Sequence, residues 1–373
     1  MTTWRYIEED GVGAARGLAT DEYLMEDCSE GPRPAAPPAL RLYTYRNHCA
    51  LVGRFQNIHA ELDLDACNQE RVDFSRRLTG GGAILMGAGQ LGVCLAIPDA
   101  MGAGNTRELY HLLSTPILMA LKNLGIDAGF RGKNDLEADG RKIAGLGIHV
   151  NPQGAAHFHA SLLVDLDIPL MLRVLRIPLQ KIGDKPNIAK VEQRIATVSG
   201  LLNRPVSTAE VRQRIKICFA EHFGVRLEAQ PLRPGEQALI DRLAAEKYRH
   251  DDWIFQRSPQ PDMTGMGLRK TPAGLLRAYV ALKGETIKSA LITGDFMDLE
   301  PLFQHIEAQL KWSPLDQQNI AKVVENAFET MRPLDPGLSP LDVQQALWRA
   351  ALGAMKEAQY TYNGSCYYPN ATT

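Results

Sequence analysis

Three consecutive glycines, residues 80–82, stand where the surrounding pattern predicts a β-sheet. They lie in the stretch RRLTGGGAILMGAGQLGVCLAIP, residues 76–98. The flanking segments 72–74 and 91–97 predict strands, because both are short and carry β-branched or aromatic residues. Glycine is unfavourable inside a strand, since it has no side chain to pack and loses much backbone entropy on folding. We therefore expect an interruption of the sheet at which bare backbone approaches a ligand.

The charge beside these glycines favours an anionic ligand. Backbone N–H groups of a glycine loop can turn toward an anion because no Cβ blocks the approach. Arg76 and Arg77 add fixed positive charge next to the loop. The segment is not a Walker A loop, since no Gly-Lys-Ser/Thr follows, and it is not a GxGxxG turn that opens a helix. The alternative is a glycine-rich hairpin with two solvated arginines.

The stretch KNDLEADGRKIAGLGIHV, residues 133–150, adds a second element. Asn134 and Asp135 precede a predicted hairpin with an Asp-Gly turn, and Lys142 begins the return strand. Gly145 and Gly147 leave one face of that strand bare. A lysine that faces a glycine-lined groove can neutralise a carboxylate or a phosphate. The alternative is an exposed lysine at the end of a strand.

The third element is the strand-like stretch HFHASLLVDLD, residues 157–167. His159 and Ser161 point to the same face of such a strand, because side chains alternate with a period of two. His157 and His159 could ligate a metal, but the sequence offers no evident third ligand. A packed or hydrogen-bonded histidine is the alternative.

The pattern as a whole predicts an α+β protein with two domains. A mixed sheet with helices is expected in residues 1–230 and a small α+β domain in residues 245–373, with 229–237 as a linker. Besides the strands named above, we expect strands at 40–45, 50–52, 128–131, 135–138, 142–150, 157–166, 274–282 and 287–293. Helices are expected at 17–26, 56–71, 106–124, 208–223, 299–310, 316–330 and 340–358, with a further polar helix that ends near 250.

Composition excludes several classes of protein. The net charge of −2 over 373 residues provides no field for nucleic acid. No apolar stretch reaches the roughly 18 residues of a membrane helix, and the N-terminus lacks the pattern of a secretory signal. The six cysteines are scattered without CxxC pairs, as in reduced thiols rather than a disulfide framework. We therefore expect a cytoplasmic protein that acts on neither nucleic acid nor membrane.

Together the three elements resemble the two-domain lipoate–protein ligases of the biotin/lipoate ligase superfamily. That family has Arg-Arg-x-Ser/Thr-Gly-Gly-Gly-Ala, then Asn-Asp-Leu before a hairpin and a Lys-Ile-x-Gly strand, then a histidine before a Leu-Leu strand. This chain has RRLTGGGA, NDLEADGRKIAG and HASLLVD. Weaker matches are YRNHCALVGRFQN upstream and KVEQRIATVSGLL downstream. The region from DDWIFQ to about residue 352 resembles the accessory domain of the long bacterial ligases.

The resemblance implies a two-step acyl transfer. Lipoate and ATP, with Mg²⁺, would form lipoyl-adenylate and pyrophosphate, and a lysine of a lipoyl carrier protein would then displace AMP. Lys142 would lie between the carboxyl oxygen and the α-phosphate and stabilise charge there. Arg77 would hold phosphate, and Asn134 and Asp135 would bind the nucleotide side, with Asp135 as an indirect Mg²⁺ contact. The other implied binding residues line the acyl chain and its carboxylate: Thr79, Gly80, Gly81, Gly82, Ala83, Gly145, Gly147, His159 and Ser161.

Two alternatives remain open at this point. The chain has Met86-Gly87 where the ligases have His-Asp, and GAGQL and KIAGLGIHV resemble stretches of the octanoyltransferases. Those enzymes move an acyl group without ATP through a cysteine thioester, yet no cysteine lies between Cys94 and Cys218. A non-catalytic acyl- or nucleotide-binding protein is the second alternative. An acidic carrier is expected near a basic rim formed by Arg173, Arg176, Lys181 and Lys185.

Overall fold

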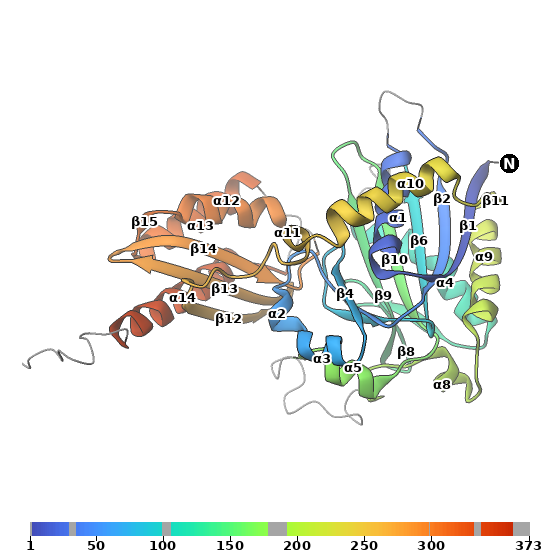
Figure 1. Cartoon of the computed structure of the whole chain (residues 1–373), viewed down its shortest axis with the longest axis horizontal. Coiled ribbons are helices and arrows are strands. Elements are labelled where there is room, and N and C mark those ends of the chain that lie inside the picture. Colours follow the sequence, from blue (N-terminus) through green and yellow to red (C-terminus); the bar gives the residue numbers. More distant parts are fainter. Residues whose placement is uncertain are drawn as a thin grey trace, which may run out of the picture. The chain divides into compact units, whose positions relative to one another are not determined.

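A computed structural model of the chain describes residues 2–29, 35–98, 106–177, 192–297, 299–331 and 337–360. Its internal contacts divide the chain into two compact units, shown in Figure 1. The first comprises Met1–Arg54 and His59–Gln256, and the second comprises Phe55–Ile58 and Arg257–Thr373. Sheets and helices are mixed in both, so the predicted α+β class is confirmed.

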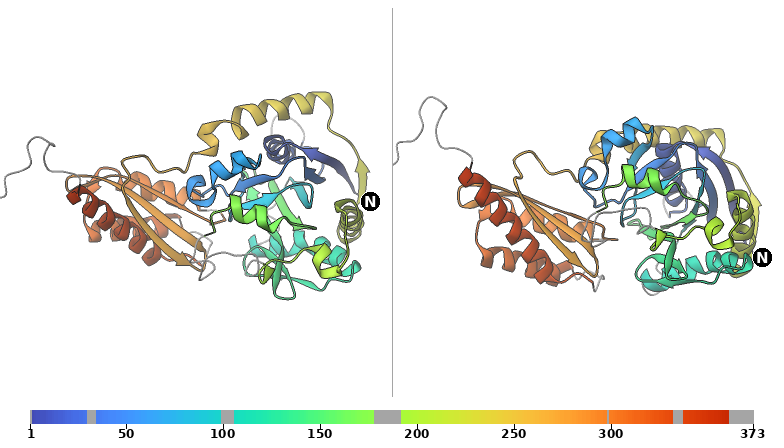
Figure 2. Two further views of the ribbon diagram at one scale, coloured as in Figure 1. Left: turned by 60° about the horizontal axis from the view of Figure 1, so that its bottom comes forward. Right: turned by 90° about the horizontal axis from the view of Figure 1, so that it is seen from below.

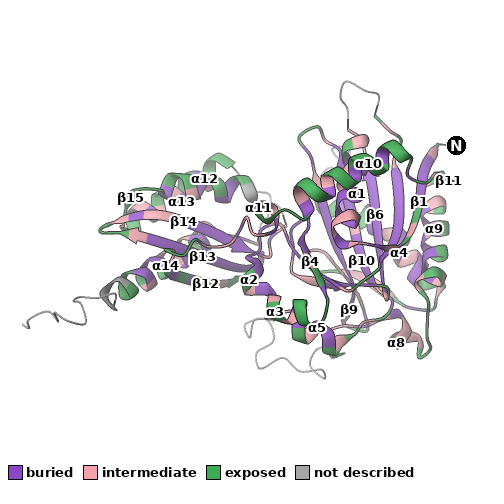
Figure 3. Cartoon of the chain, viewed as in Figure 1, coloured by how far each residue is buried: buried purple, intermediate pink, exposed green. Residues whose placement is uncertain are grey.

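The first unit is built on a mixed sheet in the order β11-β1-β2-β6-β10-β9-β8-β7. The strand β1 pairs in parallel with both β11 and β2, whereas the other neighbours are antiparallel. In Figure 3 the central strands are buried along most of their length. The strands are, in chain order, β1 (Thr3–Val12), β2 (Ala39–Tyr45), β6 (Gln90–Ile97), β7 (Ala128–Arg131), β8 (Asp135–Ala138), β9 (Arg141–Val150), β10 (Ala156–Leu163) and β11 (Arg226–Ala229).

A separate small sheet carries the glycine loop. It has the order β4-β3-β5, formed by β3 (Cys49–Val52), β4 (Asp73–Arg76) and β5 (Ile84–Met86). The glycines lie between β4 and β5, so the predicted interruption of the sheet is confirmed. The predicted strands 40–45 and 50–52 belong to different sheets, because β2 pairs with β6 while β3 pairs with β4 and β5.

Helices cover both sides of the large sheet, with α10 and α4 on opposite sides in Figure 2. Alternate residues of β2 pack with Leu18 and Leu24 of α1 in one buried cluster. A glycine at position 17 lets α1 approach closely, since a Cβ there would lie 2.7 Å from the ring of Tyr45. The helices are α1 (Ala14–Asp27), α2 (Ile58–Glu61), α3 (Leu64–Gln69), α4 (Thr106–Asn123), α5 (Ile168–Val174), α8 (Val198–Leu202), α9 (Thr208–Phe223), α10 (Pro234–Leu243), a π-helical turn (Ala244–Tyr248) and α11 (Asp251–Ile254).

The second unit packs helices on a smaller sheet of order β12-β13-β14-β15. Two glycines of β12 let α14 lie directly on the strand, because a Cβ at Gly267 would meet the carbonyl oxygen of Ala346 at 1.9 Å. The elements are β12 (Gly265–Thr271), β13 (Gly274–Lys283), β14 (Thr286–Gly294), β15 (Ser313–Pro314), α12 (Glu300–Leu310), α13 (Gln317–Met331) and α14 (Pro340–Tyr360).

The structure departs from the sequence predictions in several elements. The strands β1, β5, β11, β12 and β15 and the short helices α5, α8 and α11 were not predicted. The helix expected over 56–71 is two short helices, and residues Phe55–Ile58 belong to the second unit. The segment 229–237 is no free linker, because Glu236 at the start of α10 forms a buried ion pair of 2.7 Å with Arg5 of β1. Residues 231–256 therefore lie with the first unit rather than beyond its expected end at residue 230.

Within the described ranges, the structure contains no helix with the length and apolar character that crossing a bilayer requires.

Candidate active site

The glycines of β9 lie beside the polar side chains of β10. Ser161 pairs with Gly145 and His159 with Gly147, and directly paired residues point to the same face of a sheet. A Cβ at Gly147 would lie only 2.4 Å from His159 Cε1 and 3.0 Å from Thr79 Oγ1. Thr79 Oγ1 in turn lies 3.3 Å from His159 Nδ1. The imidazole therefore fills the space left by the missing side chain, and the glycine loop contacts β10 at this point.

The ammonium group of Lys142 lies over Gly145. A Cβ at that glycine would be 3.1 Å from Lys142 Nζ and 3.4 Å from Ser161 Oγ. Asp135 of β8 holds the ammonium, with 2.7 Å between Nζ and Oδ1. About one third of each side chain is exposed, so the charge can still meet a ligand. The sequence predicts this bare surface, because Gly145 and Gly147 alternate along the strand that begins at Lys142.

The backbone of Lys142 is held by a segment from later in the chain. Its N–H donates to the carbonyl of Arg194 over 2.8 Å, and its carbonyl accepts from the N–H of Ala196 over 2.8 Å. This segment belongs to KVEQRIATVSGLL, the downstream motif of the sequence resemblance. The downstream motif thus supports the strand that carries Lys142.

Arg77 anchors the glycine loop. Its guanidinium is buried and donates to the carbonyls of Leu51 at 2.5 Å, Gly80 at 3.1 Å and Gly82 at 2.8 Å. Burial lowers the pKa of Arg77 to about 10. The sequence expectation that Arg77 holds phosphate differs from this geometry, since one terminal nitrogen donates to two carbonyls of the loop and the other donates to Leu51 of β3. Its neighbour Arg76 is also buried rather than solvated.

Arg76 fixes the other side of the same loop. Its donors reach the carbonyls of Gly53 and Arg54 and those of Trp253 and Ile254 at 2.7–3.0 Å. The alternative of two solvated arginines is therefore wrong, because carbonyl groups from three chain segments surround the pair. The buried cations hold the loop in one conformation.

The glycines of the loop differ in their surroundings. Gly81 has a φ of +88°, a conformation that favours glycine. A Cβ at Gly53 would lie 2.0 Å from the carbonyl oxygen of Gly81, so two backbones are in contact there. At Gly82 no atom lies within 4 Å of the Cβ position, and Ala83 is half-buried. The open side of the loop is thus at Gly82.

Asn134 is engaged in the structure of the hairpin. Its Nδ2 donates to the carbonyl of Leu146 over 2.8 Å, and its own carbonyl accepts from the N–H of Leu146 over 2.8 Å. Asp135 is the carboxylate that the resemblance relates to Mg²⁺. A metal ion at its Oδ1 would face the ammonium of Lys142, so the donor set fits a role in orienting this lysine better than a direct metal contact.

A narrow cavity opens between the glycine loop, β10 and α1. Its water-accessible volume is about 20 Å³, roughly the space of one water molecule, so an acyl chain would enter only if the lining side chains move apart. Apolar and aromatic side chains line it together with six polar or charged ones: Asp21, Arg77, Thr79, His157, His159 and Ser161. The lining residues are Leu18, Asp21, Tyr43, Tyr45, Leu51, Arg77, Leu78, Thr79, Ile84, Met86, His157, His159, Ala160, Ser161 and Tyr248.

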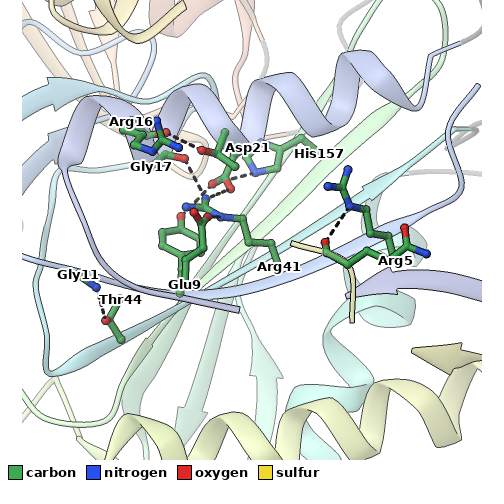
Figure 4. Close-up of polar contacts among 12 residues, drawn as sticks. Arg5, Glu9, Gly11, Arg16, Gly17, Asp21, Arg41, Thr44 and His157 are labelled. Atoms are coloured by element: carbon green, nitrogen blue, oxygen red, sulfur yellow. Dashed lines mark hydrogen bonds and ion pairs between the residues drawn. The ribbon is translucent and has the colours of Figure 1, made fainter. Parts of the chain in front are cut away.

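Sequence reasoning missed a buried charge cluster at this cavity, shown in Figure 4. Arg41 of β2 is fully buried and lies 2.6 Å from both Asp21 of α1 and Glu9 of β1. Tyr43 Oη donates to Asp21 Oδ2 over 2.9 Å. The signal was an arginine inside the apolar strand ALRLYTY and an aspartate three residues from Leu18 and Leu24, on the buried face of α1. His157, for which the sequence offered a metal-ligand role or simple packing, lies beside Asp21.

Charge and burial set the protonation of these groups. Burial alone would raise the pKa of the Asp21 carboxyl, but Arg41 and the contacts of His157 and Tyr43 hold it below its usual range. Burial holds the pKa of His159 well below 6.5, and the charges of His157 and Arg77 act in the same direction. His159 is therefore neutral near pH 7.

The described cysteines do not provide a reactive thiolate. Burial raises the pKa of Cys28 to about 12 and that of Cys67 to about 11. The pKa values of Cys49 and Cys94 lie well above the usual value for the same reason, and that of Cys218 is raised. All five side chains are buried.

The Met86-Gly87 departure has a packing explanation. A Cβ at Gly87 would lie 2.7 Å from the ring of His48, so the imidazole occupies the place of a side chain. Met86 is buried and joins the cluster beneath α1.

The basic rim is partly neutralised. Arg173 Nε lies 2.6 Å from Glu70 Oε1, and an Arg176 nitrogen lies 3.4 Å from Asp63 Oδ2. Lys181 and Lys185 lie outside the described residues.

The fold and this site define a class of acyl-transferring ligase-like enzymes. Residues 14–220 match the Lipoyl protein ligase A/B catalytic domain family. Since the match spans more than half of the chain, the protein belongs to this family, whose members include lipoate ligases and octanoyltransferases.

Two curated relatives carry different names. The chain is 27% identical over 284 residues to octanoyltransferase LipM of Halalkalibacterium halodurans, covering 69% of this chain and 100% of the relative. It is 25% identical over 323 residues to lipoate-protein ligase LplJ of Bacillus subtilis, covering 86% of this chain and 93% of the relative.

Two solved structures are similar as well. One is the bi-partite lipoate protein ligase of Thermoplasma acidophilum, described with its E2 lipoyl domain. It has a TM-score of 0.61 and 27% identity, with 70% of this chain and 99% of that chain covered. The other is lipoate-protein ligase A bound with ATP, with a TM-score of 0.58, 25% identity and 68% and 98% covered.

Proposed function

We propose that the protein is an ATP-dependent, AMP-forming ligase that attaches lipoate or a closely related acid to a lysine of a lipoyl carrier protein. One observation carries the proposal: an ammonium group, Lys142, lies at the edge of a bare glycine surface while every described cysteine is buried and protonated. Such a site suits charge stabilisation during adenylation and lacks the nucleophile that a thioester route needs.

The chemistry follows from two anions that must approach each other. A carboxylate oxygen of the acid attacks the α-phosphorus of ATP, the bond to pyrophosphate breaks, and an acyl-adenylate forms. The amine of a carrier lysine then attacks the acyl carbon, loses a proton and expels AMP. The ammonium of Lys142 reduces the repulsion between carboxylate and phosphate and stabilises the charge on departing AMP. Magnesium would enter with the ATP phosphates and supply further positive charge there.

The neighbouring residues have distinct tasks in this scheme. Asp135 orients Lys142, and the loop held by Arg77 offers the backbone of Gly82 to the carboxylate end of the acid. Neutral His159, with Thr79 and Ser161, lines the entrance to the acyl cavity. Similarity to a structure bound with ATP and to a ligase named for lipoate supports the choice of substrates.

The second candidate is an octanoyltransferase that takes its acyl group from a carrier thioester without ATP. The specific observation in its favour is the similarity to LipM proteins, which spans the whole length of the H. halodurans relative. That similarity covers 69% of this chain, whereas the similarity to LplJ covers 86%. The buried thiols favour the ligase.

A direct test supplies the purified protein with lipoate, ATP and Mg²⁺ and measures pyrophosphate. The ligase releases pyrophosphate in a reaction that depends on the free acid, and the mass of an added lipoyl carrier domain rises by one lipoyl group. The transferase would be supported instead by two results together. The protein would transfer an acyl group from octanoyl-acyl carrier protein without ATP, and it would release no pyrophosphate with free lipoate or free octanoate.

A further inference from the structure

The acyl cavity has a polar inner end. His157 lies on the same face of β10 as His159 and Ser161, because the three alternate along the strand. Ser161 is beside Gly145 and Lys142, and His157 is four residues further along β10. At about 3.3 Å of rise per residue, that is roughly 13 Å along the strand. An eight-carbon acid with its carboxylate at Lys142 would therefore bring the far end of its chain toward His157.

The side chain of His157 lies beside an aspartate that already has two closer partners. Asp21 is already satisfied, with Arg41 at 2.6 Å from Oδ1 and the Tyr43 hydroxyl at 2.9 Å from Oδ2. His157 Nε2 lies 3.6 Å from the same Oδ2, which orients the ring (Figure 4). Among the described residues neither Nδ1 nor Nε2 of His157 has a hydrogen-bond partner, although the residue is only 4% exposed.

A buried polar atom without a partner is unfavourable and indicates a missing ligand group. The imidazole lines the cavity together with two aromatic rings, Tyr43 and Tyr45, whose centroids lie 5.4 Å apart at 83°. Aromatic rings attract polarizable sulfur, and an imidazole nitrogen can exchange a weak hydrogen bond with a sulfur atom or a thiol. A plain hydrocarbon terminus would leave the nitrogen unpaired.

We propose that His157, oriented by Asp21, makes the inner end of the cavity selective for an acid whose chain ends in sulfur, such as lipoate, over a plain fatty acid such as octanoate. This inference rests on the proposed function for the position of the carboxylate at Lys142. His157 is then a specificity-determining residue at the end of the cavity opposite the reacting atoms.

The test measures the dissociation constants of lipoate and octanoate by titration calorimetry, without ATP or carrier protein, for wild type, His157→Leu and the control His222→Leu. We expect wild type and control to prefer lipoate by about tenfold and His157→Leu to bind the two acids within a factor of about two. An unchanged preference in a folded His157→Leu variant, or no preference in wild type, would overturn the inference.

A second measurement does not depend on a variant that folds. In wild-type protein labelled with ¹⁵N-histidine, the Nδ1 resonance of His157, assigned with the variant spectrum or by elimination, should shift with lipoate more than with octanoate. Equal shifts contradict the inference. Pyrophosphate release with both acids at equal kcat/KM would leave the proposed ligase activity intact and overturn the selectivity. Selective binding of lipoate without pyrophosphate release would instead support the selectivity and contradict the ligase activity.

Discussion

Lys142 Nζ lies 2.7 Å from Asp135 Oδ1, across the turn of a single hairpin. The two residues come from adjacent antiparallel strands, and the turn between them places Asp139 and Gly140 at φ of +51° and +70°, as a type I′ turn requires. A short local turn therefore positions the ammonium on which the proposed chemistry depends.

Replacing Lys142 by alanine should remove the transition-state charge stabilisation. We expect Lys142→Ala to lower kcat for pyrophosphate release by at least about a hundredfold, as for loss of other preorganised charge donors. Arg141→Ala, one residue earlier on β9, is the matched control and should retain activity within a few-fold. Equal rates for Lys142→Ala and wild type, with both proteins folded by circular dichroism, would remove the basis of the mechanism.

Asp135 acts through Lys142, so its loss should have a smaller and different effect. Asp135→Asn keeps the size of the side chain but removes the charge that orients the ammonium. We expect kcat to fall by about tenfold, which corresponds to about 1.4 kcal/mol of barrier, while KM for the acid changes little. Steady-state kinetics separate the two parameters. A fall confined to KM for MgATP would identify Asp135 as a nucleotide or metal contact instead.

The glycine at position 147 makes room for His159. In Gly147→Ala the new Cβ would meet the imidazole at 2.4 Å, so the ring must move into the acyl cavity. We expect a loss of stability of about 1–3 kcal/mol from overpacking and a higher dissociation constant for the acid. At Gly129 no atom lies within 4 Å of the Cβ position, and Gly129→Ala should leave binding unchanged. Chemical denaturation and calorimetry compare the two variants.

Replacing Arg77 distinguishes two roles for its charge, which are binding phosphate and holding the glycine loop in place. Arg77→Met leaves the carbonyls of Leu51, Gly80 and Gly82 without their donor. We expect a loss of about 3 kcal/mol in the free energy of unfolding, measured without any ligand, and none for the exposed control Arg249→Met. Unchanged stability with weaker ATP binding would favour the phosphate role.

Acid should destabilise the fold through His149, a half-buried histidine that is neutral in the folded state. Burial and the charge of Arg54 lower the pKa of His149 to about 3, against about 6.5 in an unfolded chain. The unfolded state then binds the proton first, so stability is full above about pH 6.5 and falls as pH drops toward 3. From pH 6.5 to 5 the loss is about 2 kcal/mol. In His149→Gln the free energy of unfolding, measured with urea, should depend less on pH over this interval. An identical dependence in the variant and wild type would contradict the lowered pKa of His149.

Local and periodic features of the site could be predicted from the sequence. The pairing of Gly147 with His159 follows from two strands of period two, and the hairpin before Lys142 follows from its turn. The cluster of Asp21, Arg41 and His157 joins three distant elements through packing that no local pattern encodes. The carbonyl contacts of Arg77, and the ion pair that ties α10 to β1, depend on long-range folding in the same way.

The formation of an activated acid tests the account most directly. Protein, MgATP and free lipoate are mixed without any carrier, and the products are quantified by mass spectrometry. Lipoyl-adenylate and pyrophosphate should appear in equal amounts with wild type and be nearly absent with Lys142→Ala. If no adenylate forms while the protein acylates a lipoyl domain from an acyl thioester, the central claim is wrong.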